Sequence, residues 1–208
     1  MRSINNKIFL LIIFVNLPFL VTSQILGSTI LNTQQLANSF MNLVGLPLNT
    51  PIINIYRGTR DGFTQSAFLA GVNGINGTYT IIKTNNGYIF GGFTKINWGL
   101  DIGWVGDSSA FIFSLINPSN YPCIIYQKNN ASNYTVFTST ASATSTGFLM
   151  GKGPDLYAAQ SSNSNSNSFG NLVTFQVPSN YTSVGSTFLT GSANFQSAEI
   201  EVFISNSI

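Results

Sequence analysis

"TYTIIKTNNGYIFGGFT", residues 78–94, is the stretch that decides the fold of this chain. Both arms are rich in β-branched and aromatic residues, which favour strands. The Asn-Gly pair between them accepts the positive φ angle of a tight turn. The stretch therefore predicts a β-hairpin with arms over 78–84 and 88–94. Gly91 and Gly92, inside the second arm, predict a bulge or the close approach of another backbone.

Short apolar runs with frequent turn signals continue on both sides of this hairpin. They predict short strands within residues 51–56, 109–117, 121–126, 133–140, 146–159, 171–178 and 186–205. Residues 97–108 are predicted to be a loop, and the Ser/Asn-rich run 161–168 a mobile surface loop. This pattern predicts a mainly β (α+β) fold, a sandwich of two antiparallel β-sheets with a few short flanking helices.

Two helices are expected near the start of the domain. Residues 31–47 form the longer one, with Asn32 or Thr33 as its N-cap, and residues 64–71 form the shorter one behind Thr64. Apolar residues at helical spacing give the longer helix one buried stripe, made of Leu36, Phe40, Leu43 and Val44.

Residues 1–23 have the layout of a secretory signal peptide. An apolar run over 8–21 follows basic residues, and Val21 and Ser23 occupy the −3 and −1 positions of a cleavage site before Gln24. The run is shorter than the roughly 20 residues of a membrane span. A cleaved leader is therefore favoured over an uncleaved signal anchor, and a secreted chain is expected.

Cleavage would leave residues 24–208 as a single domain of zero net charge. The chain holds eight Lys and Arg against six Asp and Glu, and Arg2 and Lys7 belong to the leader. Without a basic run, nothing in the charge pattern favours nucleic acid or an anionic membrane. The absence of histidine excludes Ser-His-Asp and Cys-His catalysis and His-bearing metal sites. We expect no metal and no cofactor.

Secretion would make the Asn-X-Ser/Thr sequons usable. We expect glycans at two or more of them, although some sequons also arise by chance in so Asn-rich a chain. The sequons are Asn76, Asn130, Asn133 and Asn180. Cys123 is the only cysteine and lies in an apolar run, which favours a buried free thiol over an intermolecular disulfide.

"IYRGTRDGF", residues 55–63, gathers Arg57, Arg60 and Asp61 in a chain with very few charges. Such a cluster could be a reactive site. A strand-to-helix turn already accounts for the same residue types, because Gly supplies backbone freedom and Asp can accept N–H groups and pair with an arginine. The open question is whether both arginines point into one pocket or along a solvated edge.

Taken together, these stretches and several others resemble a TLDc domain, the domain of the oxidation-resistance proteins and their nuclear-receptor coactivator relatives. The resemblance covers about residues 26–205 and rests on STILNTQQL, IYRGTRDGFTQSAF, TIIKTNNGYIFGGFT, SAFIFSLIN, GKGPDLY and FLTGSANFQSAEIEVF in that order. The residues that carry the family signature are Arg57, Gly58, Asp61, Gly62, Phe63, Gly87, Gly91, Gly92, Asp155, Glu199 and Glu201.

The resemblance implies a sandwich of two antiparallel sheets with small helices. It also implies a role in protection from oxidative stress and, for intracellular members, binding of the vacuolar ATPase. The family has no established reaction. Many relatives carry a His and a Cys just after the short helix, where this chain has Leu69 and Val72. Thiol chemistry is therefore not expected at that point.

The best enzymatic hypothesis uses the carboxylates of Glu199 and Glu201, with Asp155 as a third. On a strand the two glutamates share a face, at a spacing that could divide acid and base roles in glycoside hydrolysis. The simpler interpretation is a solvated strand face. For Asp155, a turn in which the carboxylate caps backbone N–H groups competes with a ligand loop. Trp98 and Trp104 are candidates for an exposed sugar platform.

The sequence thus predicts a secreted, glycosylated, non-catalytic TLDc-type module that binds a protein or a glycan or protects against stress. A carboxylate-dependent hydrolase using Glu199, Glu201 and Asp155 is the first alternative. The second is a regulatory partner of a membrane complex such as the vacuolar ATPase, a partner that rests on the resemblance alone.

Overall fold

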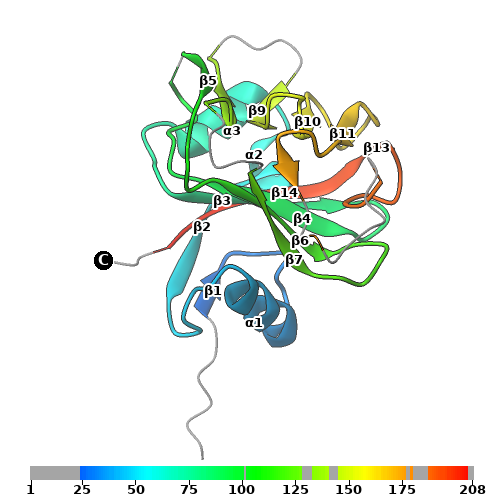
Figure 1. Ribbon diagram of the computed structural model, residues 1–208. Helices are drawn as coiled ribbons and strands as arrows, with labels where there is room; N and C mark the ends of the chain where they lie inside the picture. Colours follow the sequence, from blue (N-terminus) through cyan, green and yellow to red (C-terminus); the bar gives the residue numbers. More distant parts are fainter. Residues whose placement is uncertain are drawn as a thin grey trace, which may run out of the picture.

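A computed structural model describes residues 24–100, 102–127, 133–140, 145–176, 179 and 187–205. Two β-sheets, of eight and six strands, pack face to face, and three helices flank them. Figure 1 shows the smaller sheet with β5, β9, β10 and β11 at the top, the larger sheet in the middle, and helix α1 below it. The predicted mainly β sandwich with short flanking helices is confirmed.

The larger sheet runs in the order β1-β2-β14-β3-β4-β6-β7-β12. Its neighbours are antiparallel except for β1 and β2, which run parallel. The strands are β1 (Gln24–Leu26), β2 (Pro51–Arg57), β14 (Ser197–Ser205), β3 (Thr78–Thr84), β4 (Ile89–Thr94), β6 (Phe111–Ile116), β7 (Cys123–Gln127) and β12 (Phe175–Gln176).

The smaller sheet runs in the order β13-β11-β10-β9-β8-β5. Its strands are β13 (Asn194–Phe195), β11 (Ser168–Gly170), β10 (Leu156–Ala159), β9 (Ser145–Met150), β8 (Val136–Thr138) and β5 (Gly103–Val105). The loop predicted over 97–108 therefore contains a strand, β5. Segment 161–168 is not a plain surface loop either, because Ser162 and Ser168 are fully buried.

The hairpin predicted over residues 78–94 is formed by β3 and β4, with Thr78 paired to Thr94 and Lys83 to Ile89. Gly87 supplies the positive φ of the turn, at 86°. The close-approach interpretation of Gly91 is confirmed, because a Cβ there would lie 1.9 Å from the Thr80 carbonyl oxygen. A side chain at that position cannot be accommodated without moving the strand.

The helices follow the expected capping chemistry. Helix α1 (Gln34–Leu43) begins after Thr33, whose hydroxyl accepts from the Leu36 N–H at 3.2 Å. Helix α3 (Gln65–Val72) begins in the same way after Thr64. Between them lies a single turn, α2 (Gly58–Asp61). Of the stripe predicted along α1, Phe40 is buried and the other three residues, Leu36, Leu43 and Val44, are partly buried and pack against the same cluster. Ala37 and Met41, which the stripe did not include, are also buried.

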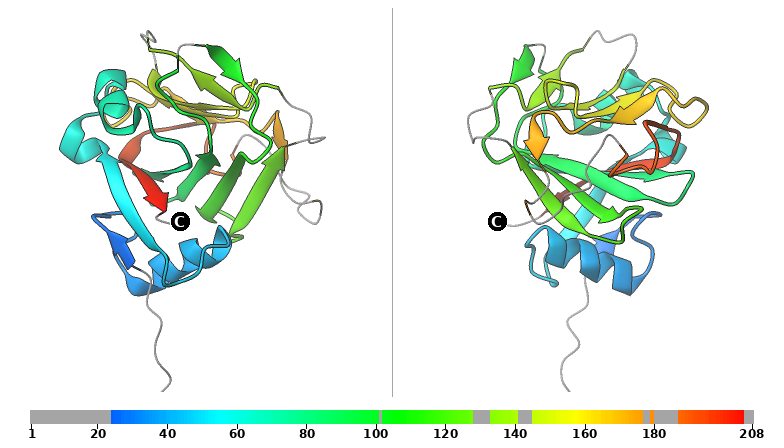
Figure 2. Two further views of the ribbon diagram at one scale, coloured as in Figure 1. Left: turned by 90° about the vertical axis from the view of Figure 1, so that its left-hand side faces the viewer. Right: turned by 45° about the vertical axis from the view of Figure 1, so that its right-hand side comes forward.

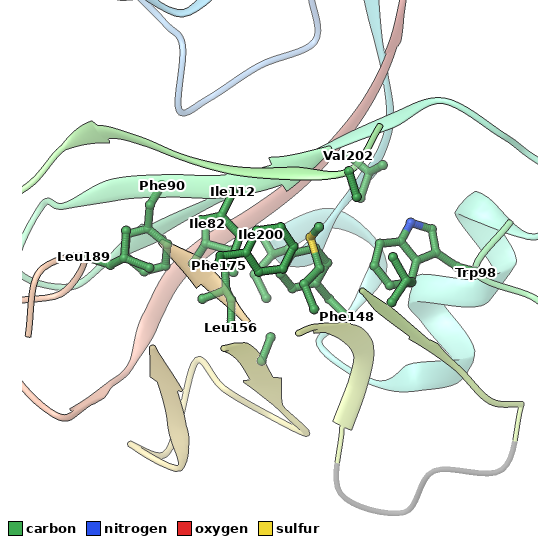
Figure 3. Packing of buried hydrophobic residues seen from close by; sticks show 14 of the residues in the cluster. Ile82, Phe90, Trp98, Ile112, Phe148, Leu156, Phe175, Leu189, Ile200 and Val202 are labelled. Atoms are coloured by element: carbon green, nitrogen blue, oxygen red, sulfur yellow. The ribbon is translucent and has the colours of Figure 1, made fainter. Parts of the chain in front are cut away.

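Two hydrophobic clusters hold the layers together. The larger one fills the space between the sheets (Figure 3). Trp98 lies at one end of it and is 1% exposed, with its indole N–H donating to Thr78 Oγ1 at 2.9 Å. Trp98 is therefore core, and the prediction of an exposed sugar platform is wrong for this residue, because the loop that carries it folds inward.

The second cluster lies on the outer face of the larger sheet. Phe40 and Met41 of α1 pack there with Ile81, Phe113 and others. Both views in Figure 2 show α1 as a separate layer against this sheet. The N-terminal layer thus has a hydrophobic core of its own. No helix of the described residues is long and apolar enough to span a membrane, and the predicted leader, 1–23, falls outside them.

Candidate functional site

Strand β14 carries Glu199 and Glu201 on one face, opposite the core residues Ile200 and Val202. The hydroxyl of Thr29 donates to both carboxylates, at 3.4 Å to Glu199 Oε2 and 2.9 Å to Glu201 Oε1. The pair therefore shares a face as predicted. The interpretation as a solvated strand face is wrong, because the glutamates are only 5% and 0% exposed. The segment between β1 and α1 covers them.

Glu201 organises that covering segment. Its Oε2 accepts from the Ser28 hydroxyl at 2.6 Å and from the Ile30 N–H at 3.4 Å. Its Oε1 accepts from the Thr29 N–H at 2.6 Å. The Ser28 hydroxyl in turn accepts from the Leu31 N–H at 2.7 Å. The backbone N–H groups of Thr29 and Ile30 thus find their acceptor on one buried carboxylate.

Glu199 holds a different segment. The Thr59 N–H, within α2, donates to Glu199 Oε1 at 2.9 Å, and the Thr59 hydroxyl donates to Oε2. In the described part of the chain neither glutamate has an ion-pair partner, and the pair formed is that of Arg60 with Asp61. Hydroxyl and N–H donors, rather than a cation, compensate the burial of the two carboxylates.

Sequence reasoning missed the donors Ser28, Thr29 and Thr59. Ser and Thr are abundant throughout the chain, so their type alone carries no signal. The one usable hint is the position of Thr59 in a short turn that holds two glycines and two arginines. The backbone N–H of such a turn is available to donate to another segment. The pairing of segments 172 or 140 residues apart is a property of the fold, not of local sequence.

The Arg-rich turn is pinned by internal pairing. Arg60 donates twice to Asp61, at 2.7 Å to each oxygen, and the Arg57 N–H donates to Asp61 Oδ2 at 2.9 Å. The hydrogen bond from Arg60 is the main reason that the pKa of Asp61 lies below its usual range. The Tyr56 hydroxyl holds the end of the turn by donating to the Gly62 carbonyl at 2.7 Å.

The two arginines of this turn have different surroundings. Arg60 lines two open surface hollows, of about 330 and 520 Å³. Arg57 lines neither, and its Nε is buried without a hydrogen-bond partner. The structure therefore does not bring both guanidinium groups into one shared pocket.

Asp155 is a separate, fully buried carboxylate at the start of β10. Its Oδ2 accepts from three successive N–H groups of the segment before and within β12, at 2.6, 2.7 and 2.8 Å from Val173, Thr174 and Phe175. Its Oδ1 has no hydrogen-bond partner. Burial, outweighing the hydrogen bonds, raises the pKa of Asp155. Its partners are distinct from those of the glutamate pair, so the three predicted acids do not form one site.

Asp107 is a buried carboxylate that sequence reasoning did not single out. It accepts from the hydroxyls of Thr94 at 2.7 Å and Ser109 at 2.6 Å and from the Lys95 N–H at 2.7 Å. Burial alone would raise the pKa of Asp107, but these hydrogen bonds outweigh it and lower the pKa. The Asp-x-Ser sequence at 107–109 is the signal that could have indicated this local turn.

Cys123 lies at the start of β7 and is 6% exposed. Its thiol is free within the described chain, and burial raises its pKa to about 11. A neutral, buried thiol is a poor nucleophile and a poor partner for a disulfide between chains. The environment fits the predicted small hydrophobic residue.

Two of the predicted glycosylation sites can be placed. Asn76, in the loop before β3, and Asn133, before β8, are both exposed. Asn130 and Asn180 lie among the residues that are not described. Exposure at the first two positions is what attachment of a glycan needs.

The reactions that Glu199, Glu201 and Asp155 could catalyse are limited because a substrate has little access to them. Glu199, Glu201 and Asp155 do not line the open hollows beside α2, the groove between α1 and β6, or the hollow at the hairpin tip. Among described residues no three His, Cys, Asp or Glu groups are placed to hold a metal ion. The buried acids therefore act in this structure as hydrogen-bond acceptors for backbone and hydroxyl groups.

The fold and the site define a class of protein: a two-sheet sandwich with an N-terminal helical layer that buried carboxylates of β14 fasten to the sheet. The sequence model of the TLDc domain matches residues 25–205, nearly the whole chain, and the protein belongs to the TLDc domain family. A search of curated protein sequences finds no match.

Proposed function

We propose that this protein is a secreted, non-catalytic TLDc-type module that acts by binding or by protecting against stress. The observation that carries the proposal is the environment of Glu199 and Glu201. Both acids are buried: donors from residues 28–30 engage Glu201, and the Thr29 hydroxyl and Thr59 engage Glu199. An acid–base pair must reach a substrate, and these two carboxylates face protein on the side where a substrate would enter. Family membership supports a binding or protective role.

Secretion is supported by the predicted leader, residues 1–23, and by the exposed sequons Asn76 and Asn133. The test is expression of the full chain with its own N-terminus in a eukaryotic cell. We expect the protein in the medium, with Gln24 as its first residue and with gel mobility that increases after glycosidase treatment. Retention in the cytosol with an intact N-terminus would contradict the proposal.

A carboxylate-dependent hydrolase remains the second candidate, because one hydroxyl, that of Thr29, contacts both glutamates. Two acids in such proximity could act on a substrate only if residues 28–30 moved away from β14. A search for turnover, with Glu199→Gln and Glu201→Gln as variants, separates this candidate from the binding module.

A further inference from the structure

A hollow of about 310 Å³ lies at the tip of the β3–β4 hairpin, and neither glutamate of the pair lines it. Three segments that are distant in sequence build it. Its polar lining is made of Thr84, Asn85, Asn86, Ser166, Asn194 and Gln196, and the largely buried Phe195 completes the lining. The volume is at the small end of the range of about 300–1,000 Å³ typical of ligand pockets.

The three segments are tied to one another by hydrogen bonds. The Asn85 N–H donates to the Gln196 carbonyl at 3.1 Å. The side-chain amide of Asn194 donates to the Ser166 carbonyl at 3.0 Å, and that of Gln196 donates to the Asn163 carbonyl at 2.5 Å. The Ser/Asn-rich segment thus serves as a wall of the hollow. A wall fixed before binding reduces the ordering cost of taking up a ligand.

Several polar groups in the hollow are left over for a ligand. In the described structure the side chains of Asn85, Asn86 and Ser166 make no hydrogen bond, and all three are exposed. Asn194 and Gln196 use their NH₂ groups internally, which leaves their carbonyl oxygens as acceptors. Amides and hydroxyls together offer both donors and acceptors, which is what a ligand hydroxyl requires.

The charge and the polarity of the lining restrict the class of ligand that this hollow can bind. No Lys, Arg, Asp or Glu lines this hollow, so nothing compensates the charge of a phosphate, a sulfate or a carboxylate. Its walls are too polar for a purely apolar ligand, since each unpaired amide would lose its water without replacement. Phe195 also lines the hollow, but its side chain is only 5% exposed and packs edge-to-face against Phe90 in the core, so the polar groups form the binding surface.

We propose that this hollow is a recognition site for a neutral carbohydrate, with Asn85, Asn86, Ser166, Asn194 and Gln196 binding its hydroxyl groups. The proposal rests on the binding-module function proposed above and names its ligand class. The exposed sequon Asn76 precedes β3, whereas Asn85 follows it, so the two are separated by the length of the strand, about 20 Å. A glycan on Asn76 therefore begins at the other end of the sheet and leaves the hollow open.

The test is saturation-transfer NMR on the purified full chain. The probes are glucose, galactose, mannose and N-acetylglucosamine, with glucuronic acid as the charged member, followed by titration calorimetry on any that binds. We expect saturable binding of at least one neutral sugar in the millimolar range or tighter. Asn85→Ala combined with Asn86→Ala should weaken that binding about tenfold, the effect of losing one or two hydrogen bonds.

Asn42→Ala is the matched control, because Asn42 is also an exposed asparagine but lies on α1, outside the hollow. It should leave the affinity unchanged, and both variants should melt like the parent, since the central positions of such a turn accept alanine. Failure of every neutral sugar to bind, preference for glucuronic acid, or parental affinity in the double variant would overturn the proposal. None of these outcomes touches secretion or the absence of turnover, on which the proposed function is tested.

Discussion

For Glu199 and Glu201, the alternating sequence pattern predicts the correct face of the strand but not the surroundings of the two side chains. Alternation along β14 correctly places both side chains on one face, opposite Ile200 and Val202. It cannot show that residues 28–30 fold over that face. The donors come from more than a hundred residues away, and no local rule connects them. Burial beneath these donors is the observation that favours a structural role for the pair over a catalytic one.

Replacing Glu201 by Gln should destabilise the fold by about 1.5–3 kcal/mol, the range for hydrogen bonds to a charged acceptor. Both carboxylate oxygens accept from backbone N–H groups, of Thr29 and Ile30. The NH₂ of a glutamine must therefore face one of these donors. Urea unfolding followed by far-UV circular dichroism measures the change. Asn42→Ala should remain within about 0.5 kcal/mol of the parent, as expected for an exposed site. A similar small effect for Glu201→Gln would contradict the assigned role.

Asp155 and Asp107 should give pH dependences of opposite sign. The raised pKa of Asp155, caused by burial, means that its contribution to stability is present below the unfolded pKa of about 3.9 and is lost as pH rises through the folded pKa. The lowered pKa of Asp107 means that its contribution is present above about 3.9 and is lost as pH falls through the folded pKa.

The measurement is the free energy of unfolding of the parent, Asp155→Asn and Asp107→Asn across acidic pH. As pH rises from about 3.9, the parent should lose stability relative to Asp155→Asn. As pH falls below about 3.9, the parent should lose its advantage over Asp107→Asn. Parallel curves for the two variants would contradict the assignments.

At the scale of elements, local sequence signals predicted the β3–β4 hairpin and the first residues of the helices. They did not predict strands that form only by pairing with a strand distant in sequence. The turn before Gly87 and the caps Thr33 and Thr64 are encoded within a few residues. Strand β5 is only three residues long and exists because it pairs with β8, about 30 residues later. Its sequence, Gly-Trp-Val, carries too little pattern to predict a strand.

The hairpin also predicts a ranking of glycine substitutions. Gly91→Ala places its Cβ 1.9 Å from the Thr80 carbonyl, whereas Gly92→Ala places it 2.2 Å from the Met150 sulfur, which can shift. We expect a loss of at least about 3 kcal/mol for Gly91→Ala and about 1–3 kcal/mol for Gly92→Ala. Gly74→Ala, at a φ of 81° in open space, should cost about 1–2 kcal/mol from its backbone conformation alone.

Differential scanning calorimetry can rank these three variants. Each kcal/mol should lower Tm by about 2–4 °C in a domain of this size. A Gly92→Ala protein that melts at or below the Tm of Gly91→Ala would contradict this ranking. It would show that the contact of Gly91 with the Thr80 backbone is not more restrictive than the contact of Gly92 with the Met150 side chain.

At the scale of the molecule, the sequence was sufficient for the class of fold and for the family. Many weak strand signals agree with one another over the region that matches the TLDc domain, residues 25–205. The sequence did not predict which polar segments meet. The glutamate pair under residues 28–30 and the amide-lined hollow at the hairpin tip both arise where segments far apart converge. Tertiary contact, rather than composition, creates them.

The exposed sequons give a whole-molecule prediction. Asn76→Gln and Asn133→Gln should each remove one glycan from the secreted protein, because both asparagines face solvent. Electrophoresis of each variant and of the double variant, before and after glycosidase treatment, measures the change. A parent that is already insensitive to the glycosidase would contradict both the glycans and the secretory route.

The most direct test of the central claim, that the paired glutamates hold the fold and perform no reaction, is a turnover assay on the purified secreted protein. Polysaccharides and chromogenic glycosides are the substrates, and Glu199→Gln and Glu201→Gln are compared with the parent under conditions where all three are folded. We predict no turnover above the blank in any of them. Robust turnover by the parent that either single substitution abolishes would contradict the claim.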